Sequence, residues 1–483
     1  MLFNSLAFFL FFPIVTAIYF ALPQRWRWLH LLAASCYFYM FFVPIYVLIL
    51  ALTIAIDYAA GILISGAEGR RRRYYLMASL AANIGVLAFF KYYNFLNATL
   101  LQLTGAVGVA WPVPFLSLIL PIGLSFHTFQ AMSYTIEVYR GHQPPERHFG
   151  IYALYVMFYP QLVAGPIERP QNLLPQFHRP HRFSSVQARS GLQLMLLGLC
   201  KKVVVADTVA PVVNVVYAAP ADHGALALAG ATALFAVQIY ADFCGYSDIA
   251  RGAARVMGFD LMVNFNRPYL ARSVAEFWQR WHISLSTWFR DYVYISLGGN
   301  RVPYARWQAN LVITFLLSGL WHGANWTFVM WGGLNGLYLV MSNWTAGLRQ
   351  QLVRWVRLDR APAVHAVVQV TFVFLIVCIA WVFFRANTLH DARTILYTMA
   401  SGAGLSPRSA LASLSAAGLS PSTLLGAAAL GAGLLLFDLA VEYRLSPDWF
   451  DRRPIWIRWG AYYAGVALVL ALLGEQPFIY FQF

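Results

Sequence analysis

Long blocks of apolar residues, separated by short polar connections, run along almost the whole chain. The blocks lie near residues 6–22, 29–48, 46–65, 75–90, 113–138, 150–165, 190–206, 226–247, 308–320, 326–342, 364–384, 422–440 and 459–474. A membrane-crossing helix needs about 20 apolar residues, and most blocks approach that length. They lack the alternating, roughly ten-residue segments that are typical of a transmembrane barrel. The pattern therefore predicts an all-α polytopic membrane protein with about eleven transmembrane helices.

Glycine and proline interrupt two of the apolar blocks, at residues 120–123 and 163–166. Because a broken helix at membrane depth must be buried in protein or line a cavity, we expect re-entrant segments at both places. The stretch at residues 401–422, rich in Ser, Ala, Gly and Leu, is expected to be a flexible connection.

The composition excludes an ordinary soluble fold. Of the 483 residues, 60% are hydrophobic and 11% are charged, whereas soluble domains carry about a quarter charged residues. Lys and Arg number 34 against 19 Asp and Glu, a net charge of +15, and they gather in short connections such as Arg25, Arg27 and 70–73. Basic connections of this kind indicate cytoplasmic loops, so we expect an outward-facing N-terminus, membrane lipid as a partner, and no nucleic acid.

A long polar stretch, between about 248 and 308, interrupts the apolar blocks. Large apolar side chains recur in it at a spacing of three and four, namely Trp278, Trp281, Leu285, Trp288 and Tyr292. This spacing predicts an amphipathic helix that lies at the membrane interface or roofs a cavity. His282 lies four residues after Trp278, at the edge of the aromatic face. It either anchors the helix through a backbone carbonyl or belongs to a site.

A second histidine, His322, lies within residues 318–326, between two apolar blocks. An ionisable side chain in such a place indicates a functional site, and the alternative is a neutral histidine packed between helices. Apolar surroundings disfavour imidazolium, so we expect a neutral ring that can accept a proton. His322 is therefore a candidate general base.

Several common catalytic motifs are missing from the sequence. HExxH, GxSxG, P-loop and GxGxxG patterns are absent, and the four cysteines show no ligand spacing. We therefore expect no metal site and no bound cofactor.

Both histidine segments resemble motifs of the membrane-bound O-acyltransferase (MBOAT) family. The matching segments are 276–295, 297–301 and 319–326, together with 121–126, 164–167, 242–248 and 478–483. They are long and specific, and they most resemble the branch of the family that contains the alginate O-acetylation integral membrane protein. The resemblance implies an MBOAT-type helical bundle, with re-entrant and interfacial helices, in which a thin partition separates a cytoplasmic funnel from an extracytoplasmic opening.

The resemblance also implies an activity. The chain would be an O-acyltransferase that moves an acetyl group from a cytoplasmic thioester, acetyl-CoA, to an extracytoplasmic acceptor for O-acetylation of an exported polysaccharide such as alginate. His322 would be the essential catalytic residue, with His282 toward the cytoplasmic end of the same tunnel. Substrate-binding or supporting residues are expected at Asn325, Trp321, Trp281, Ser286, Arg290 and Asp291. A periplasmic or membrane-anchored SGNH-type acetyltransferase, with a Ser-His-Asp site, would complete the transfer to sugar.

The implied location is the bacterial cell inner membrane, with several membrane passes and a periplasmic N-terminus. We expect a single integral membrane domain over residues 1–483. Its parts would be N-terminal spans over about 1–110, a catalytic core over about 111–345 and C-terminal spans over about 346–483.

Two kinds of alternative remain open at the level of sequence. Within the family, the chain would transfer D-alanine to teichoic acid, or acetylate peptidoglycan or cellulose. In a different class, it would be a proton-coupled transporter in which His322 relays protons. The absence of an internal repeat counts against the transporter.

Overall fold

The structure, a computed structural model, describes residues 1–117, 121–163, 165–443, 446, 449–474, 476 and 478–479. Every regular element within these residues is helical, which confirms the predicted all-α fold. The chain forms two compact units. Unit 1 comprises Met1–Met195 and Tyr246–Val263, and unit 2 comprises Leu196–Gly245 and Asn264–Phe483.

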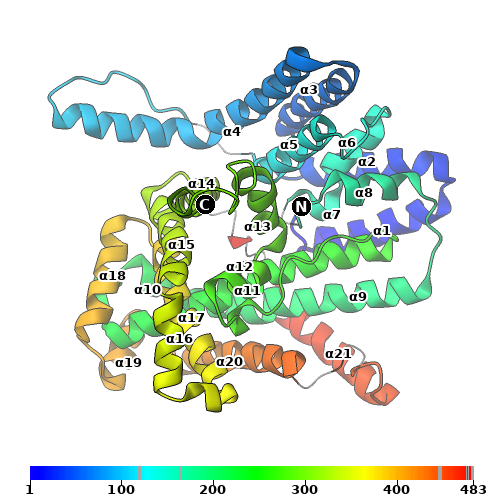
Figure 1. Ribbon diagram of the computed structural model, residues 1–483. Coiled ribbons are helices and arrows are strands. Elements are labelled where there is room, and N and C mark those ends of the chain that lie inside the picture. The colour runs from blue at the N-terminus through cyan, green and yellow to red at the C-terminus, as the bar shows by residue number, and fades with distance from the viewer. Residues whose placement is uncertain are drawn as a thin grey trace. The chain divides into compact units, whose positions relative to one another are not determined.

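Unit 1 is built mainly from the first third of the chain (Figure 1). Its helices are α1 (Leu6–Ala21), α2 (Gln24–Met40), α3 (Tyr46–Gly66), α4 (Gly69–Ala106), α5 (Leu124–Arg140), α6 (Phe149–Met157), α7 (Tyr159–Leu162), α8 (Pro170–His178) and most of α9 (Ser185–Leu199). Helix α3 packs against α4 and α5. The buried carboxylate of Asp57 on α3 accepts hydrogen bonds from Ser79 and Asn83 of α4, which satisfies a charge that burial alone would make costly.

Unit 2 contains the rest of the helices. They are η1 (Cys200–Ala206), α10 (Asp207–Ala218), η2 (Pro220–Asp222), most of α11 (Ala225–Val256), η3 (Pro268–Leu270), α12 (Val274–Arg280), α13 (Ile283–Phe289), η4 (Arg290–Tyr294), α14 (Tyr304–His322), α15 (Trp326–Trp344), α16 (Ala346–Trp355), η5 (Leu358–Arg360), α17 (Pro362–Arg385), α18 (Leu389–Ser401), α19 (Pro407–Ala416), α20 (Pro421–Tyr443) and α21 (Ile455–Leu472). Among the described helices, α14 packs most extensively against α15, and α15 also packs against α17.

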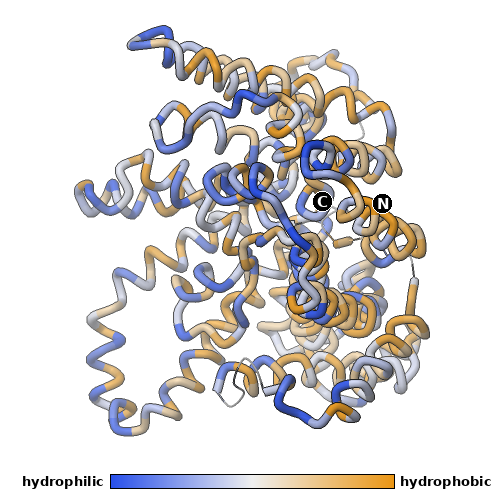
Figure 2. The backbone as a smooth tube through the Cα atoms, turned by 90° about the vertical axis from the view of Figure 1, so that its right-hand side faces the viewer, coloured by the Kyte–Doolittle hydropathy of each residue, from blue (hydrophilic) through white to orange (hydrophobic). Residues whose placement is uncertain are grey.

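Six of the described helices are long and apolar enough to cross a membrane. They are α3, α4, α11, α17, α20 and α21. Figure 2 shows that apolar residues predominate along many of the helices and that polar residues gather at many of the turns and helix ends. This agrees with a polytopic membrane protein, while the number of about eleven spans stays a prediction.

Regular helix is absent from the described residues of both predicted interruptions: α5 begins only at Leu124, after Gly123 with a φ of 77°, and α7 ends at Leu162. The block near 150–165 also breaks at Phe158, between α6 and α7, which was not predicted. That these segments are re-entrant stays a prediction. Leu120 and Ala164 of these interruptions lie outside the described residues. A side chain on Gly123 would also meet the backbone oxygen of Leu162 at 2.7 Å, so the turn requires glycine.

The predicted flexible connection at residues 401–422 is wrong. Helix α19 occupies Pro407–Ala416, and the hydroxyl of Ser406 caps it by accepting the backbone N–H of Ser409. The same small residues that indicated a loop provide an N-cap and good helix formers, and α19 buries Ala410 and Leu414.

A buried charge cluster stabilises the interior of unit 2. The ammonium of Lys202 in η1 lies 2.8 Å from a carboxylate oxygen of Asp207 and 2.9 Å from one of Asp242 on α11. Asp242 also accepts the backbone N–H of Ile479 at 2.7 Å. One ammonium thus pairs with two carboxylates, and one of these carboxylates also holds the backbone at Ile479.

Candidate active site

His282 lies at a break between two short helices. Helix α12 ends at Arg280, α13 begins at Ile283, and the backbone of His282 has a φ of 42°. This left-handed conformation cannot continue a right-handed helix and is uncommon outside glycine. The prediction of one amphipathic helix through residues 276–292 is therefore wrong. Its aromatic face is buried in the protein instead of lying at an interface.

Asn264 stabilises this break through both its main chain and its side chain. Its backbone oxygen accepts the N–H of Ile283 at 2.9 Å. Its Oδ1 accepts the backbone N–H of Ser284 at 3.2 Å and the Ser284 hydroxyl at 2.9 Å. The same Oδ1 lies 3.1 Å from Nδ1 of His282.

The contacts of Asn264 determine the tautomer of His282. Because a backbone N–H can only donate, the Asn264 atom that it meets must be the amide oxygen. The nearby Nδ1 of His282 must then carry the proton, which leaves the lone pair on Nε2. His282 is fully buried and is held in the form whose Nε2 can accept a proton.

His322 is the last residue of α14 and is only 4% exposed. The described rings that contact it include three, those of Trp321 at 4.9 Å, Trp331 of α15 at 4.9 Å and Phe384 of α17 at 5.3 Å between centroids. All three meet the imidazole at steep angles, between 72° and 86°. These apolar walls favour the neutral ring, because an imidazolium here would lose its hydration.

The indole of Trp321 lies next to both histidines. Its ring centroid is 4.9 Å from that of His322 and 6.2 Å from that of His282. On its other side, the His282 ring contacts Phe243 at 4.5 Å. The two histidines predicted from separate motifs therefore belong to one aromatic cluster within unit 2.

Three glycines allow α14 and α15 to approach closely enough to form this cluster. A Cβ on Gly319 would lie 2.3 Å from the backbone oxygen of Phe328, and one on Gly332 would lie 2.3 Å from that of Phe315. A Cβ on Gly323 would lie 2.1 Å from the Phe328 ring. The absence of side chains at these glycines lets α14 and α15 lie close together, with Trp331 beside His322.

The other predicted site residues have identifiable local contacts. Asn325 caps α15 by accepting the Thr327 N–H at 3.0 Å, and its amide donates to the Asn387 backbone oxygen at 3.2 Å. The Ser286 hydroxyl donates to the backbone oxygen of Trp281 at 3.0 Å, beside the helix break. Trp281 is buried and its ring lies 5.0 Å from that of Trp381.

Comparison with known proteins assigns this arrangement to a family. The model of MBOAT, the membrane-bound O-acyltransferase family, matches residues 114–385, which include both histidines. The chain belongs to the membrane-bound O-acyltransferase family. It is accordingly a multi-pass membrane protein and an O-acyltransferase.

Curated relatives of this acyltransferase differ in the acceptor that their names state. A probable alginate O-acetylase of Azotobacter vinelandii is 40% identical over 396 residues, which cover 81% of this chain and 76% of that protein. A peptidoglycan O-acetyltransferase of Helicobacter pylori is 32% identical, covering 84% of this chain and 81% of that protein. A teichoic acid D-alanyltransferase of Streptococcus thermophilus is 30% identical over half of this chain and 60% of that protein.

The aromatic cluster around the two histidines contains residues that the sequence analysis did not single out. Trp331 and Trp381 stack at 6.0 Å with 20° between their planes, and Trp331 also lies 5.7 Å from Trp278. The buried indole N–H groups of Trp278 and Trp381 meet no hydrogen-bond acceptor among the described residues. Trp381 and Phe384 lie near the end of the apolar helix α17, and only the tertiary structure relates them to His322.

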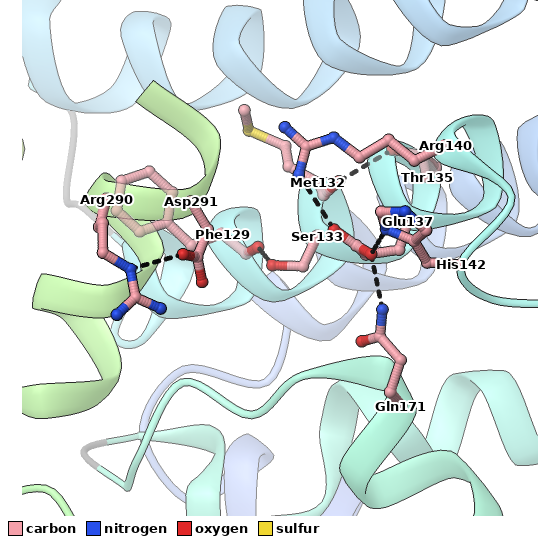
Figure 3. Close-up of polar contacts among 10 residues, drawn as sticks. All are labelled: Phe129, Met132, Ser133, Thr135, Glu137, Arg140, His142, Gln171, Arg290 and Asp291. Carbon is pink, nitrogen blue, oxygen red and sulfur yellow. Dashed lines mark hydrogen bonds and ion pairs between the residues drawn. The ribbon is translucent and has the colours of Figure 1, made fainter. Parts of the chain in front are cut away.

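The charged pair at the end of α13 is closer to the surface. The guanidinium of Arg290 lies 2.7 Å from a carboxylate oxygen of its neighbour Asp291, and 60% of the Arg290 side chain is exposed (Figure 3). The two charges compensate each other, and the predicted supporting or substrate-binding role of this pair stays a prediction.

Unit 1 of the acyltransferase has a polar cluster of its own around Glu137, near the end of α5. The buried carboxylate accepts hydrogen bonds from Arg140 at 3.3 Å, His142 at 3.0 Å and Gln171 at 2.6 Å (Figure 3). Gln171 belongs to α8, so the cluster connects α5 to α8. Its carboxylate is already satisfied by protein groups, which is typical of a structural anchor.

Proposed function

We propose that this chain moves an acetyl group from cytoplasmic acetyl-CoA across the bacterial inner membrane to an extracytoplasmic hydroxyl. The acetyl group then serves O-acetylation of an exported polysaccharide such as alginate. The observation that carries the proposal is the single aromatic cluster that contains His282, Trp321 and His322 in a family of O-acyltransferases.

The chemistry needs little beyond what such a cluster offers. A thioester is already activated, so the enzyme has to align it with the hydroxyl, accept the hydroxyl proton and exclude water. The hydroxyl oxygen forms the new ester bond, the thiolate of the donor leaves, and the proton passes through the histidine to the departing thiolate. In this proposal His322 is the general base.

His282 supports the reaction from the donor side. The tautomer set by Asn264 gives Nε2 a lone pair that can accept a hydrogen bond from the donor and so help to orient it. The indole N–H groups of Trp278 and Trp381 are suited to donate to carbonyl oxygens of the donor, because neither meets an acceptor among the described residues. Asn325, whose amide already has two backbone partners, contributes by holding the start of α15 beside His322.

The acceptor is a hydroxyl presented by a partner. The sequence contains no GxSxG nucleophile motif, and the described neighbours of His322 include the bulky rings of Trp331 and Phe384, which suit a single small hydroxyl. We therefore propose a periplasmic or membrane-anchored SGNH-type acetyltransferase as the partner that modifies the polymer. The names of two relatives, which state alginate and peptidoglycan, agree with acetyl transfer to a carbohydrate polymer.

The decisive experiment is label transfer in reconstituted vesicles that contain the purified chain. Acetyl-labelled acetyl-CoA is supplied on the cytoplasmic side, with and without the candidate partner and with alginate outside. Label should reach the polymer only when chain and partner are both present. If label reaches the polymer at an equal rate without the partner, the proposed transfer through a partner protein is contradicted. Transfer of D-alanine in place of acetyl would favour the teichoic acid alternative.

A further inference from the structure

A groove of about 1040 Å³ lies in unit 2, away from the histidine cluster. It is bounded by the start of α12, the end of α15, α16 and the start of α17. Its lining is mostly apolar and includes Val274, Tyr338, Leu352, Val368, Phe372 and Ile376. The volume is at the upper end of small-molecule sites, which span roughly 300–1,000 Å³. None of the residues assigned to acyl transfer lines it.

Helix α16, one wall of the groove, has the features of a helix that lies at a membrane surface. None of its residues is buried, and two large apolar side chains point away from the protein, Leu348 at 68% and Trp355 at 81% exposed. Between residues 346 and 361 the chain carries four arginines and one aspartate. A short helix with exposed Trp and Leu and several Arg residues is typical of the boundary between headgroups and acyl chains.

Cationic side chains line the polar part of the groove. Arg349 and Arg354 of α16 both line it, as does Arg272 just before α12. The Arg349 guanidinium donates to the backbone oxygen of Ser342 at 2.6 Å, which fixes its position. Within the part of the chain that the structure describes, neither Arg349 nor Arg354 forms an ion pair with a carboxylate. The groove therefore combines an apolar interior with positive charge that protein groups do not neutralise.

We propose that this groove binds one acidic phospholipid, with its acyl chains along α17 and its phosphate at Arg349 and Arg354. A ligand with long apolar chains matches the Val, Leu, Phe and Ile lining, and a phosphate matches two guanidinium groups. A nucleotide would match the charges but would leave its ribose and base against aliphatic side chains without polar partners. The lipid site stands independently of the proposed acyl transfer.

The groove is connected to the histidine cluster through two helices. Helix α12 begins at the groove and ends beside His282, and α17 runs from the groove to Trp381 and Phe384. A bound lipid therefore contacts both helices that position the cluster. Occupancy should raise the melting temperature of the chain as well as fill the groove.

The test measures lipid retained by the purified full-length chain in mixed micelles, with phosphatidylglycerol and phosphatidylcholine of identical acyl chains as probes. The wild-type chain should prefer phosphatidylglycerol and be stabilised by it. Arg349→Gln combined with Arg354→Gln should weaken phosphatidylglycerol binding by roughly 30-fold, as expected for two interfacial cations. The matched control is Arg357→Gln with Arg360→Gln, which removes the same charge from residues outside the lining and should leave binding within about threefold of wild type.

A second variant separates the burial of the lipid's acyl chains from the effect of the arginine charges. Val368→Trp fills the groove and keeps every arginine, so it should reduce lipid retention while Arg354→Gln alone gives an intermediate loss. An equal loss of phosphatidylglycerol binding in the two double arginine variants would show that positive surface charge attracts the lipid without a specific site, and this would overturn the proposal. Undiminished retention in Val368→Trp, or equal affinity for the two lipids, would also overturn it. A third outcome would assign the groove to the thioester donor instead. In that case the wild-type chain would bind free coenzyme A and show no preference between the lipids, and the double variant Arg349→Gln with Arg354→Gln would lose coenzyme A binding.

Discussion

A single acceptor atom, Oδ1 of Asn264, determines much of the chemistry available to His282. It receives hydrogen bonds from the His282 ring and from two groups of Ser284, so three donors depend on one amide oxygen. Removing it takes this acceptor away from buried donors, and a buried donor that is left unpaired costs about 1–3 kcal/mol. The ring would then be free to adopt the other tautomer.

Replacing Asn264 with Ala should therefore lower both stability and acetyl transfer. We expect a lower melting temperature in detergent and a transfer rate reduced by at least about tenfold, because the His282 ring loses its fixed tautomer. Asn266→Ala is the matched control, since Asn266 is exposed and its side chain contacts only Arg267 among the described residues. Wild-type transfer in Asn264→Ala would refute the positioning role.

His322→Ala should abolish acetyl transfer with little loss of folded protein. General base catalysis contributes roughly 10²–10⁴-fold to a rate, and the rings of Trp321, Trp331 and Phe384 beside His322 cannot act as a base in its place. His282→Ala should reduce transfer less, or weaken donor binding. The exposed His390 of α18 provides the control variant, His390→Ala. Full transfer in His322→Ala would exclude the mechanism, and loss of folded protein would indicate a structural role.

At the scale of elements, the sequence was informative wherever a helix is determined by its own residues. Long apolar blocks predicted most of the helices, and Gly123 predicted a break, because both signals are local. The break at His282 could not be predicted, since the aromatic spacing around it is helical and the group that holds it, Asn264, lies 18 residues earlier. The contribution of Trp381 and Phe384 to the site was likewise hidden, because α17 packs against α15 only in the folded chain.

The close packing of α14 and α15 depends on glycine, and one extra methyl group tests it. In Gly332→Ala the new Cβ would meet the backbone oxygen of Phe315 at 2.3 Å, so the helices must separate, at a cost of about 1–3 kcal/mol. Separation moves Trp331 away from His322, so transfer should fall together with the melting temperature. In the adjacent control, Gly333→Ala, the new methyl meets only a side-chain atom of Leu316 at 3.6 Å, and no loss is expected. Equal behaviour of the two variants would contradict this account.

The segment between α7 and α8 should make the stability of the protein pH-dependent. Burial raises the pKa of Glu168 to about 7, although the Met262 N–H, the Asn172 amide, Arg169 and Arg251 all oppose the shift. The folded protein then retains a proton that the unfolded chain, with a pKa near 4.5, has already released. Glu168 therefore makes its full contribution to the free energy of unfolding below about pH 4.5, and this contribution is lost as the pH rises to about 7.

Glu168→Gln, which cannot ionise, should remove this loss. Relative to the variant, the wild-type melting temperature in detergent should fall between pH 5 and pH 7 and then become constant. Asp260→Asn, at a carboxylate that is 74% exposed in the same unit, should show no such trend. If the melting temperatures of Glu168→Gln and wild type differ by the same amount at every pH, the pH dependence does not come from Glu168.

At the scale of the whole chain, the distribution of basic residues predicts which side of the membrane each connection faces. Arg25 and Arg27 follow α1, and residues 70–73 begin α4 after α3. If α1, α2 and α3 each cross the membrane, an even number of crossings separates these two basic groups, so both can lie in the cytoplasm. The same count gives a periplasmic N-terminus.

Single cysteines at Arg25 and Arg71, in a chain without its four natural cysteines, test this orientation. Both positions are exposed. They should react with an impermeant thiol reagent only after the inner membrane is opened, because the reagent cannot otherwise reach the cytoplasm. Labelling in intact spheroplasts would show that the orientation is the opposite one. The proposed thioester donor would then enter from the other side of the membrane.

The stacked tryptophans give the site an optical signature. Trp331 and Trp381 lie 6.0 Å apart and nearly parallel, and Trp281 lies 5.0 Å from Trp381. Indoles at such separations share their electronic excitations, so their near-ultraviolet circular dichroism depends on the angles between the rings. If the proposed thioester donor binds beside His322 and tilts one ring of the set, this signal should change. Arrival of the donor can therefore be followed by spectroscopy of the unmodified enzyme, before any acetyl group has moved.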